Sequence, residues 1–192
     1  MMTKTLAVAV AATFLAVGAQ QPPPLQTVPR VDLDRYAGDW YEVARLPNRF
    51  QNRCIGDVRA SYTRRDDGRI DVVNRCRTED GAIDARGVAR VVDENTFAQL
   101  EVRFAPALLS FLPMVWGDYW IIGLADDYSW AVVGSPDRKY LWILSRTADL
   151  EPALFDRAVR IARDNGFDVT RLVKTTHAKV RNSARRRVAM IV

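Results

Sequence analysis

Trp40 and Arg146 form the residue pair with the most informative chemistry in this chain. Trp40 follows Gly38 and Asp39 at the start of one alternating segment, and Arg146 ends another alternating segment, residues 140–146. A guanidinium that lies on the face of an indole ring makes a cation–π contact. If both side chains point inward, the pair closes one end of a small barrel. The cup that results is a place for a ligand.

Further side chains share the inward phase of Trp40 and Arg146. They include the polar residues Glu42, Tyr62, Asn74 and Tyr140, and buried polar groups must be hydrogen bonded. Two interpretations stay open: these groups bond one another or water, or they orient the headgroup of a ligand. The residues predicted to line the interior and contact a ligand are Glu42, Ala44, Val58, Ala60, Tyr62, Val72, Asn74, Ala89, Leu100, Val102, Tyr119, Tyr140 and Trp142. The small wall residues Ala44, Ala60, Gly87, Ala89 and Ala98 favour a cavity over a packed core.

The same residues offer little for catalysis. The sole histidine, His177, lies near the C-terminus, so no Ser-His-Asp arrangement is expected inside a barrel. The sequence has no metal-ligand cluster and no glycine-rich phosphate loop, so we expect no metal, no cofactor and no catalytic residue. An enzyme that acts on a lipophilic substrate remains the alternative, with Cys54 as a nucleophile only if it is unpaired.

Cys54 and Cys76 are predicted to form a disulfide, because the chain carries an export signal. With a hairpin turn at residues 66–68, Cys76 lies opposite about Val58, and an ideal strand would leave Cys54 ~13 Å away along the ladder. The bond therefore requires a bulge or fold-back near Ile55 and Gly56.

Four segments divide the chain of 192 residues. Residues 1–19 read as a secretory signal, 20–30 as a proline-rich linker, 31–172 as one domain and 173–192 as a basic tail. No cysteine follows the cleavage site, so we expect an exported protein without a lipid anchor, periplasmic or secreted or peripheral to the outer membrane. Removing Lys4 and the six basic residues of the tail from the net charge of +5 leaves −2 for residues 20–172. The basicity belongs to a solvated tail, and no nucleic-acid partner is expected.

Period-two alternation predicts the elements that position these residues. Eight strands joined mostly by short turns are expected at residues 40–45, 58–63, 70–76, 87–92, 97–104, 119–124, 130–134 and 140–146. This pattern is typical of an all-β, eight-stranded up-and-down antiparallel barrel. A C-terminal helix follows, with Asp149 as its expected cap and Asn165-Gly166 at its end, and it packs outside the barrel. A short ninth strand is expected to begin at residues 167–169.

Four ordered motifs, at residues 38–45, 119–122, 126–133 and 140–146, resemble those of the lipocalin family, in particular its bacterial members similar to apolipoprotein D. The resemblance spans residues 31–172. It implies a non-catalytic protein that binds and transports or stores fatty acids, lysophospholipids or similar amphiphiles in the barrel. Strand order places Gly38, Trp40, Asp127 and Arg146 at the same, closed end.

The loop of residues 105–117 then falls at the open end. It is long and apolar, which is typical of a contact with a ligand or a membrane. The residues predicted to touch a membrane are Leu108, Leu109, Phe111, Leu112 and Trp116. A lid folded over the barrel is an equal alternative, and docking against a second copy of the chain in a homodimer also stays open.

Overall fold

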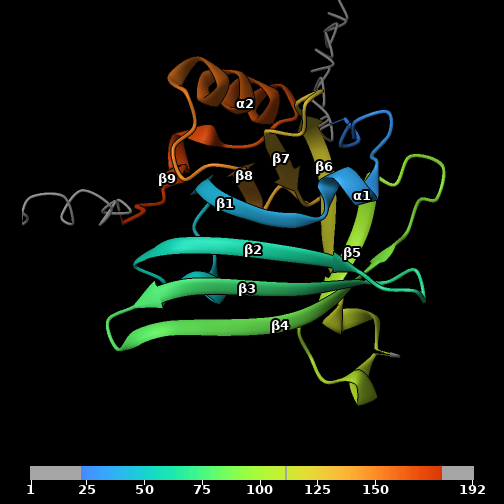
Figure 1. The fold of residues 1–192 in the computed structure, drawn as a ribbon. Coiled ribbons are helices and arrows are strands. Elements are labelled where there is room, and N and C mark those ends of the chain that lie inside the picture. The colour runs from blue at the N-terminus through green and yellow to red at the C-terminus, as the bar shows by residue number, and fades with distance from the viewer. Residues whose placement is uncertain (1–22, 111, 179–192) are drawn as a thin grey trace, which may run out of the picture.

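The predicted strands wind into one closed antiparallel barrel (Figure 1). The computed structural model describes residues 23–110 and 112–178. The strand order is β2-β3-β4-β5-β6-β7-β8-β1-β9, and a further pairing of β1 with β2 closes the ring. The strands are β1 Gly38–Arg45, β2 Gly56–Arg64, β3 Ile70–Thr78, β4 Gly81–Val91, β5 Gln99–Arg103, β6 Gly117–Leu124, β7 Trp130–Gly134, β8 Leu141–Ser145 and β9 Val173–Lys174.

Two α-helices of the described part of the chain flank the barrel. The short helix α1, Leu33–Tyr36, is not predicted by the periodicity, and the Asp32 carboxylate caps it by accepting from the backbone N–H groups of Asp34 and Arg35. The longer helix α2, Pro152–Asp164, starts with Pro152 in its first turn after Glu151, so the expected Asp149 cap is wrong. Short 3-10 helices occupy Arg49–Gln51, Ala107–Leu109, Pro113–Val115 and Val169–Arg171. Within the described ranges, no helix combines the length and apolar character that crossing a bilayer requires.

Alternation along the strands produces two apolar clusters, one on each side of the barrel wall. The inner cluster contains Trp40, Val72 and Ile121, and the outer cluster contains Ile143 together with Ala158 and Ala162 of α2. The two alanines are fully buried, so α2 lies close against the outer face of β6, β7 and β8 (Figure 1). The helix therefore covers a face of the sheet that would otherwise be wet.

Both ends of the described chain pack on the barrel, which corrects two segment boundaries. Leu25, from the predicted linker, is buried in the outer cluster, and the N–H of Val28 donates to the carbonyl of Ile121. Val173–Lys174, from the predicted tail, pairs with β1 as strand β9. The ninth strand thus lies after a 3-10 turn at Val169–Arg171 and does not begin at residues 167–169. Residues 1–22 and 179–192, with the predicted signal and the arginine-rich end, lie outside the described residues.

At the end of the barrel that is remote from α1, the wall has a gap between β4 and β5 (Figure 1). β4 pairs with β5 only from Val88 to Val91, and residues 81–86 of β4 are exposed on both faces. In Figure 1, the far ends of β3 and β4 extend away from β5 accordingly. Ala85 lies opposite Asn74 on the inner side of this sheet, so the inner wall is accessible here.

Candidate ligand-binding site

The Arg146 guanidinium lies on the indole of Trp40 and closes one end of the barrel, as the sequence predicts. The guanidinium carbon is 3.8 Å from the ring centroid, and Trp40 is completely buried. Arg146 Nη1 donates to the carbonyl of Asp39 at 2.8 Å, and Nη2 donates to the carbonyl of Arg35 at 2.7 Å. Charged hydrogen bonds of this kind fix the guanidinium over the ring.

Helix α1 supplies the acceptors at this closed end. The last carbonyls of a helix have no partner within it. Those of Arg35 and Tyr36 accept from Arg146, and the Tyr36 carbonyl also accepts from Trp40 Nε1 at 2.8 Å. Gly38 enters β1 with a φ of 92°, a left-handed conformation that favours glycine, and Arg146 Nη1 lies against the place of its missing Cβ.

Asp127 acts locally within the closed end. Its carboxylate accepts from the backbone N–H and the hydroxyl of Ser129 in the β6–β7 turn, and these bonds lower the pKa of Asp127. The Arg35 guanidinium covers the neighbouring Tyr128 ring at 4.0 Å from its centroid. Asp127 therefore shapes the turn beneath the Trp40–Arg146 pair.

Three tyrosines form the floor above the closed end. The hydroxyls of Tyr36 and Tyr119 lie 2.8 Å apart, and those of Tyr62 and Tyr119 lie 2.9 Å apart. Burial raises the pKa of Tyr62 to about 12 and raises the pKa values of Tyr36 and Tyr119 well above their usual range. The phenols are therefore neutral donors and acceptors that satisfy one another.

The floor leaves little space, so the cavity that the small wall residues predict does not extend to this depth. The pocket bounded by these tyrosines has a volume of about 10 Å³, enough for one water. Ala89 and Ala98 are buried within the inner cluster, and Phe104 lies over Gly87, where a Cβ would approach its ring to 2.8 Å. The inner cluster therefore fills the barrel around these tyrosines.

A β-bulge in β1 reverses the expected side of two residues. The pairing with β8 is regular at Glu42–Leu144 and resumes one residue later at Ala44–Ile143, so Val43 is the extra residue. Ala44 therefore belongs to the outer cluster beside α2, and its prediction as a ligand contact is wrong. Arg45 takes the inward place opposite Trp142, a side chain that packs on the inner cluster.

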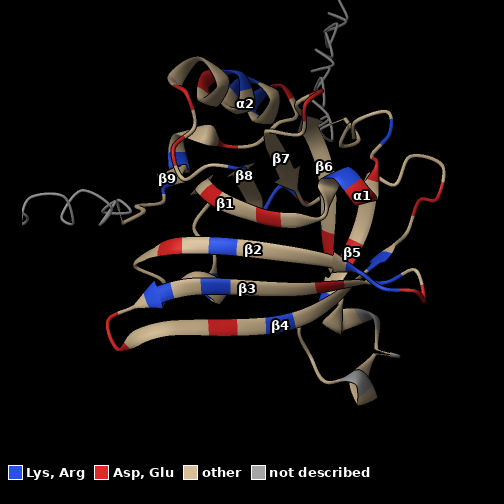
Figure 2. Cartoon of the chain, in the orientation of Figure 1, with Lys and Arg blue, Asp and Glu red and all other residues tan. Residues whose placement is uncertain are grey.

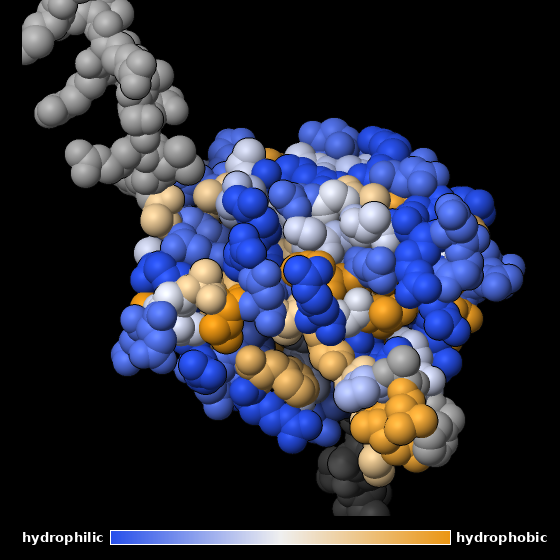
Figure 3. Space-filling view, turned by 60° about the horizontal axis from the view of Figure 1, so that its bottom comes forward, coloured by the Kyte–Doolittle hydropathy of each residue, from blue (hydrophilic) through white to orange (hydrophobic). Residues whose placement is uncertain are grey.

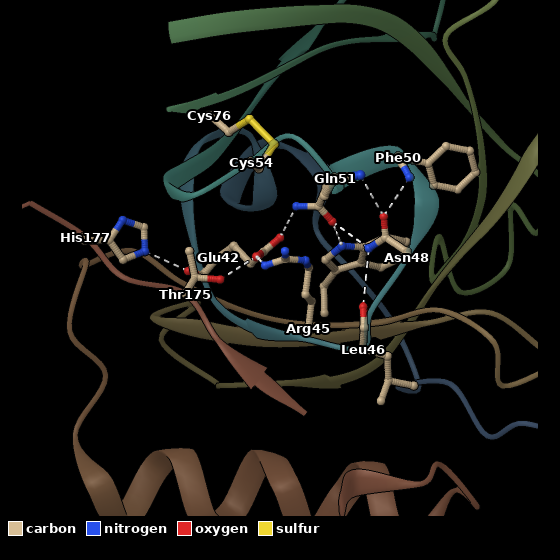
Figure 4. Close-up of polar contacts among 11 residues, drawn as sticks. Glu42, Arg45, Leu46, Asn48, Phe50, Gln51, Cys54, Cys76, Thr175 and His177 are labelled. Carbon is tan, nitrogen blue, oxygen red and sulfur yellow. Dashed lines mark hydrogen bonds and ion pairs between the residues drawn. A yellow bond between two sulfur atoms is a disulfide. The ribbon is translucent and has the colours of Figure 1, made fainter. Parts of the chain in front are cut away.

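Glu42 and Arg45 form the centre of a hydrogen-bonded group on the inner wall (Figure 4). The Glu42 carboxylate accepts from Arg45 Nη1 at 3.0 Å, Gln51 Nε2 at 2.5 Å and the Thr175 hydroxyl at 2.5 Å. Gln51 Oε1 in turn accepts from Trp142 Nε1 at 3.0 Å. Glu42 is only 3% exposed, and its hydrogen-bond partners are protein groups. Of the two interpretations of the inward polar residues, mutual hydrogen bonding therefore applies to Glu42.

The C-terminal segment completes the wall between β1 and β2. The Nε2 atom of His177 lies 2.7 Å from the Glu42 carbonyl, and the N–H of Ala178 donates to the Asp57 carboxylate at 2.6 Å. That bond, with a second from Arg77, lowers the pKa of Asp57. His177 and Thr175 are thus wall residues, which the interpretation of residues 173–192 as a tail misses.

Cys54 and Cys76 are bonded, with Cα atoms 5.6 Å apart. The pairing of β2 with β3 is irregular between Gly56 and Arg59, the bulge that the bond requires. The disulfide ties the β1–β2 connection to β3, and no free cysteine is present among the described residues. Cys54 is therefore not available as a nucleophile.

Aromatic side chains line the mouth of the cup. Tyr140 stacks on Trp142 at 6.0 Å between centroids and 10° between ring planes, and Phe50 lies 5.5 Å from Tyr140. Phe50 is 65% exposed and Phe104 is 46% exposed. Figure 3 shows this face of the molecule hollowed, with apolar surface beside the opening.

The loop between β5 and β6 provides part of that apolar surface. Leu108 is 82% exposed and Leu109 is 37% exposed, whereas Leu112 is half-buried. The Trp116 ring lies 4.1 Å from the Arg90 guanidinium, and its Nε1 donates to the carbonyl of Ser110. Trp116 is half-buried, and Phe111 lies outside the described residues.

Charged residues of both signs are mixed over the outer strands (Figure 2). Arg90 pairs with Glu101 at 2.7 Å and Arg75 with Asp84 at 2.6 Å across neighbouring strands. No group of three His, Cys, Asp or Glu side chains within residues 23–110 and 112–178 could hold a metal ion. The described strands therefore carry no large patch of one charge sign that would attract a strongly charged partner.

The structure brings most of the other predicted lining residues to the inner side, at different depths. Val72, Ala89 and Leu100 are buried around the floor, while Ala60, Val102, Tyr119 and Trp142 pack partly against them. Val58 is buried on β2, and Asn74 and Tyr140 are half-buried toward the mouth. The sequence pattern does not identify Arg45 and Gln51 as residues of the inner wall. Arg45 turns inward because of the bulge at Val43, and Gln51 belongs to a loop that folds inward, and neither feature is visible in the alternation.

A closed antiparallel barrel with a capped end, an open aromatic mouth and an external helix defines the class of small barrel proteins that hold a ligand in a cup. The family model described as lipocalin-like domain matches residues 31–177. The chain belongs to the lipocalin family.

Relatives and solved structures agree with this assignment. The chain is 39% identical to temperature-induced lipocalin-1 of Arabidopsis thaliana, over 79% of this chain and 82% of the relative. It is 36% identical to outer membrane lipoprotein Blc of Escherichia coli K12, over 88% and 93%, and 32% identical to apolipoprotein D of Mus musculus, over 81% of each. The structure of insecticyanin from Manduca sexta shares the fold with a TM-score of 0.65 and 19% identity, covering 83% of this chain and 87% of that one.

Lipocalins are in general binding proteins, so membership implies a hydrophobic ligand.

Proposed function

We propose that this protein binds a single-chain amphiphile, a fatty acid or a lysophospholipid, in the mouth half of its barrel and carries or stores it in the cell envelope. The observation that carries the proposal is the contrast within the lumen: a packed floor at Tyr36, Tyr62 and Tyr119 lies beneath an open, aromatic mouth. The chain of the ligand would lie against Ala60, Asn74, Val102, Phe104 and Trp142, with its head near the opening.

Apolar burial supplies the affinity in this proposal. Each methylene removed from water contributes about 0.8 kcal/mol, so about ten methylenes give the ~8 kcal/mol of a micromolar complex before the costs of association. The aromatic surface of Tyr140 and Trp142 adds wide contact area with few rotatable bonds.

The cargo proposal is tested on protein purified without delipidation. Native mass spectrometry is expected to show an adduct with the mass of a fatty acid or lysophospholipid, and delipidated protein is expected to bind oleate with a change in tryptophan fluorescence. Trp142→Phe should remove most of that fluorescence change. Absence of both an adduct and oleate binding contradicts the proposal.

Export and membrane contact form the second part of the proposal. The signal-like residues 1–19 support delivery to the envelope, and the relative Blc is named as an outer membrane lipoprotein. Exposed Leu108 and Leu109 beside the mouth support contact with a lipid surface during exchange. Leu108→Asp with Leu109→Asp is expected to reduce vesicle binding and transfer of oleate, while Val92→Asp, an exposed control outside this loop, leaves both unchanged. Unaltered binding and transfer in the loop variant would rule out this contact.

A further inference from the structure

Arg45 is held inside the cup by the bulge at Val43. It lies opposite Trp142 in the β1–β8 pairing, and its side chain is 14% exposed. An arginine in the wall of an apolar cup is costly to retain unless its donors are used. The partners of Arg45 therefore decide whether it serves the fold alone.

Glu42 does not use all the donors of Arg45. Its carboxylate is already shared among Arg45 Nη1, Gln51 Nε2 and the Thr175 hydroxyl. A guanidinium has five N–H donors, and the buried Nε atom of Arg45 has no hydrogen-bond partner. Among the described residues, the guanidinium makes one hydrogen bond, from Nη1 to Glu42, and its buried Nε is enclosed by protein, so the remaining Nη donors are the ones that a ligand head could reach.

The position of Arg45 suits the head of a chain that enters through the mouth. Its partner strand carries Trp142, which contacts Tyr140 on the mouth side, while Leu144 on the same strand lies opposite Glu42 and packs in the inner cluster. A polar head at Arg45 would leave the chain on the apolar side of the cup, where Ala60 and Val102 pack against the same cluster. Planar guanidinium geometry matches carboxylate and phosphate oxygens through paired hydrogen bonds.

We infer that Arg45 is the headgroup anchor of this barrel and selects amphiphiles with an anionic head, either a carboxylate or a phosphate. This inference rests on the proposed function and names the ligand class for the same site. Glu42, Gln51 and Thr175 are positioning residues, because they hold Arg45 and do not need to touch the ligand.

The test uses three probes with the same chain: dodecanoate, dodecyl phosphate and dodecanol. The full chain is expected to bind the two anions at least roughly tenfold more tightly than the alcohol, the effect of one hydrogen bond to a charged group. Arg45→Met should remove this preference by weakening anion binding and leaving dodecanol binding unchanged. Arg45→Lys should keep part of the preference, since it retains the charge without the planar fork.

Arg49 offers a matched control, since its guanidinium lies over the exposed Phe50 ring. Arg49→Met should leave the preference intact. A loss confined to dodecyl phosphate identifies a lipid phosphate as the anion, and a loss confined to dodecanoate identifies a free fatty acid. Equal weakening of all three probes, or no change, overturns the inference.

Glu42→Gln gives a second measurement if Arg45→Met does not fold. Without the Glu42 charge, the anions should bind more tightly and the alcohol should not, because Arg45 is no longer neutralised. An unchanged ratio between anions and alcohol would contradict the anchor role. Failure of all three probes to bind any folded variant or the parent chain counts against the proposed function, whereas equal binding of acid and alcohol counts only against Arg45.

Discussion

The two ends of the barrel use aromatic residues in opposite ways. At the closed end, Trp40 is completely buried, covered by Arg146 and bonded to the Tyr36 carbonyl. At the mouth, Trp142 and Tyr140 stack on one another but remain half-exposed. The first arrangement fixes the fold and the second leaves apolar surface unpaired. The comparison shows that stability and binding are separated along the barrel axis.

Replacing the tryptophan at each end by alanine gives the largest expected difference between the two ends. Trp40→Ala should lower the free energy of unfolding by about 3–5 kcal/mol, because a fully packed aromatic is lost and Arg146 keeps no ring beneath it. Trp142→Ala, the matched control at the mouth, should cost about 1–2 kcal/mol and should weaken oleate binding instead. Urea unfolding measures both. Equal losses at the two positions would show that the ends do not differ.

Alkaline unfolding sharpens the comparison at the floor. Burial raises the pKa of Tyr62 to about 12 and raises those of Tyr36 and Tyr119. Tyrosines in the unfolded chain ionise near pH ~10. The unfolded state therefore loses these protons first, and the stability that the neutral phenols contribute is present below about pH 10 and falls as the pH rises toward their folded values.

The expected slope is about 1.4 kcal/mol per pH unit for each of the three tyrosines over that window. Urea unfolding from about pH 8 to pH 11 measures the slope of the unfolding free energy against pH. Tyr62→Phe should lower that slope by the contribution of one tyrosine. A stability that stays flat across this range would mean that the tyrosines of the floor are not buried as a neutral group.

Some features could be predicted because they depend on simple alternation. Trp40 and Arg146 both lie on the inward face that period-two alternation predicts for their strands. Strand order places them at the same end of the barrel, so their contact could be predicted. The bulge near Gly56 could also be anticipated, because Cys54 and Cys76 cannot bond without it. In both cases a distant partner constrains the local geometry.

Other features could not be predicted, because they depend on a single inserted residue or on an element too short to show a period. The bulge at Val43 moves Ala44 out and Arg45 in, and a shift of one residue exchanges the faces of a strand. Helix α1 has only four residues, too few for a helical period. Val173–Lys174 carries a basic residue and no alternation, so a two-residue strand beside β1 looks like the start of a tail.

The central claim is that the ligand occupies the mouth half of the lumen above a packed floor. A fatty acid that carries a nitroxide on its chain tests this directly in an NMR spectrum of the full chain. The account predicts the strongest line broadening for the amides of Asn74, Ala85 and Trp142, and weaker broadening for those of Ile121 and Ala158. Broadening centred on α2, or none at any amide while the fatty acid is bound, would contradict it.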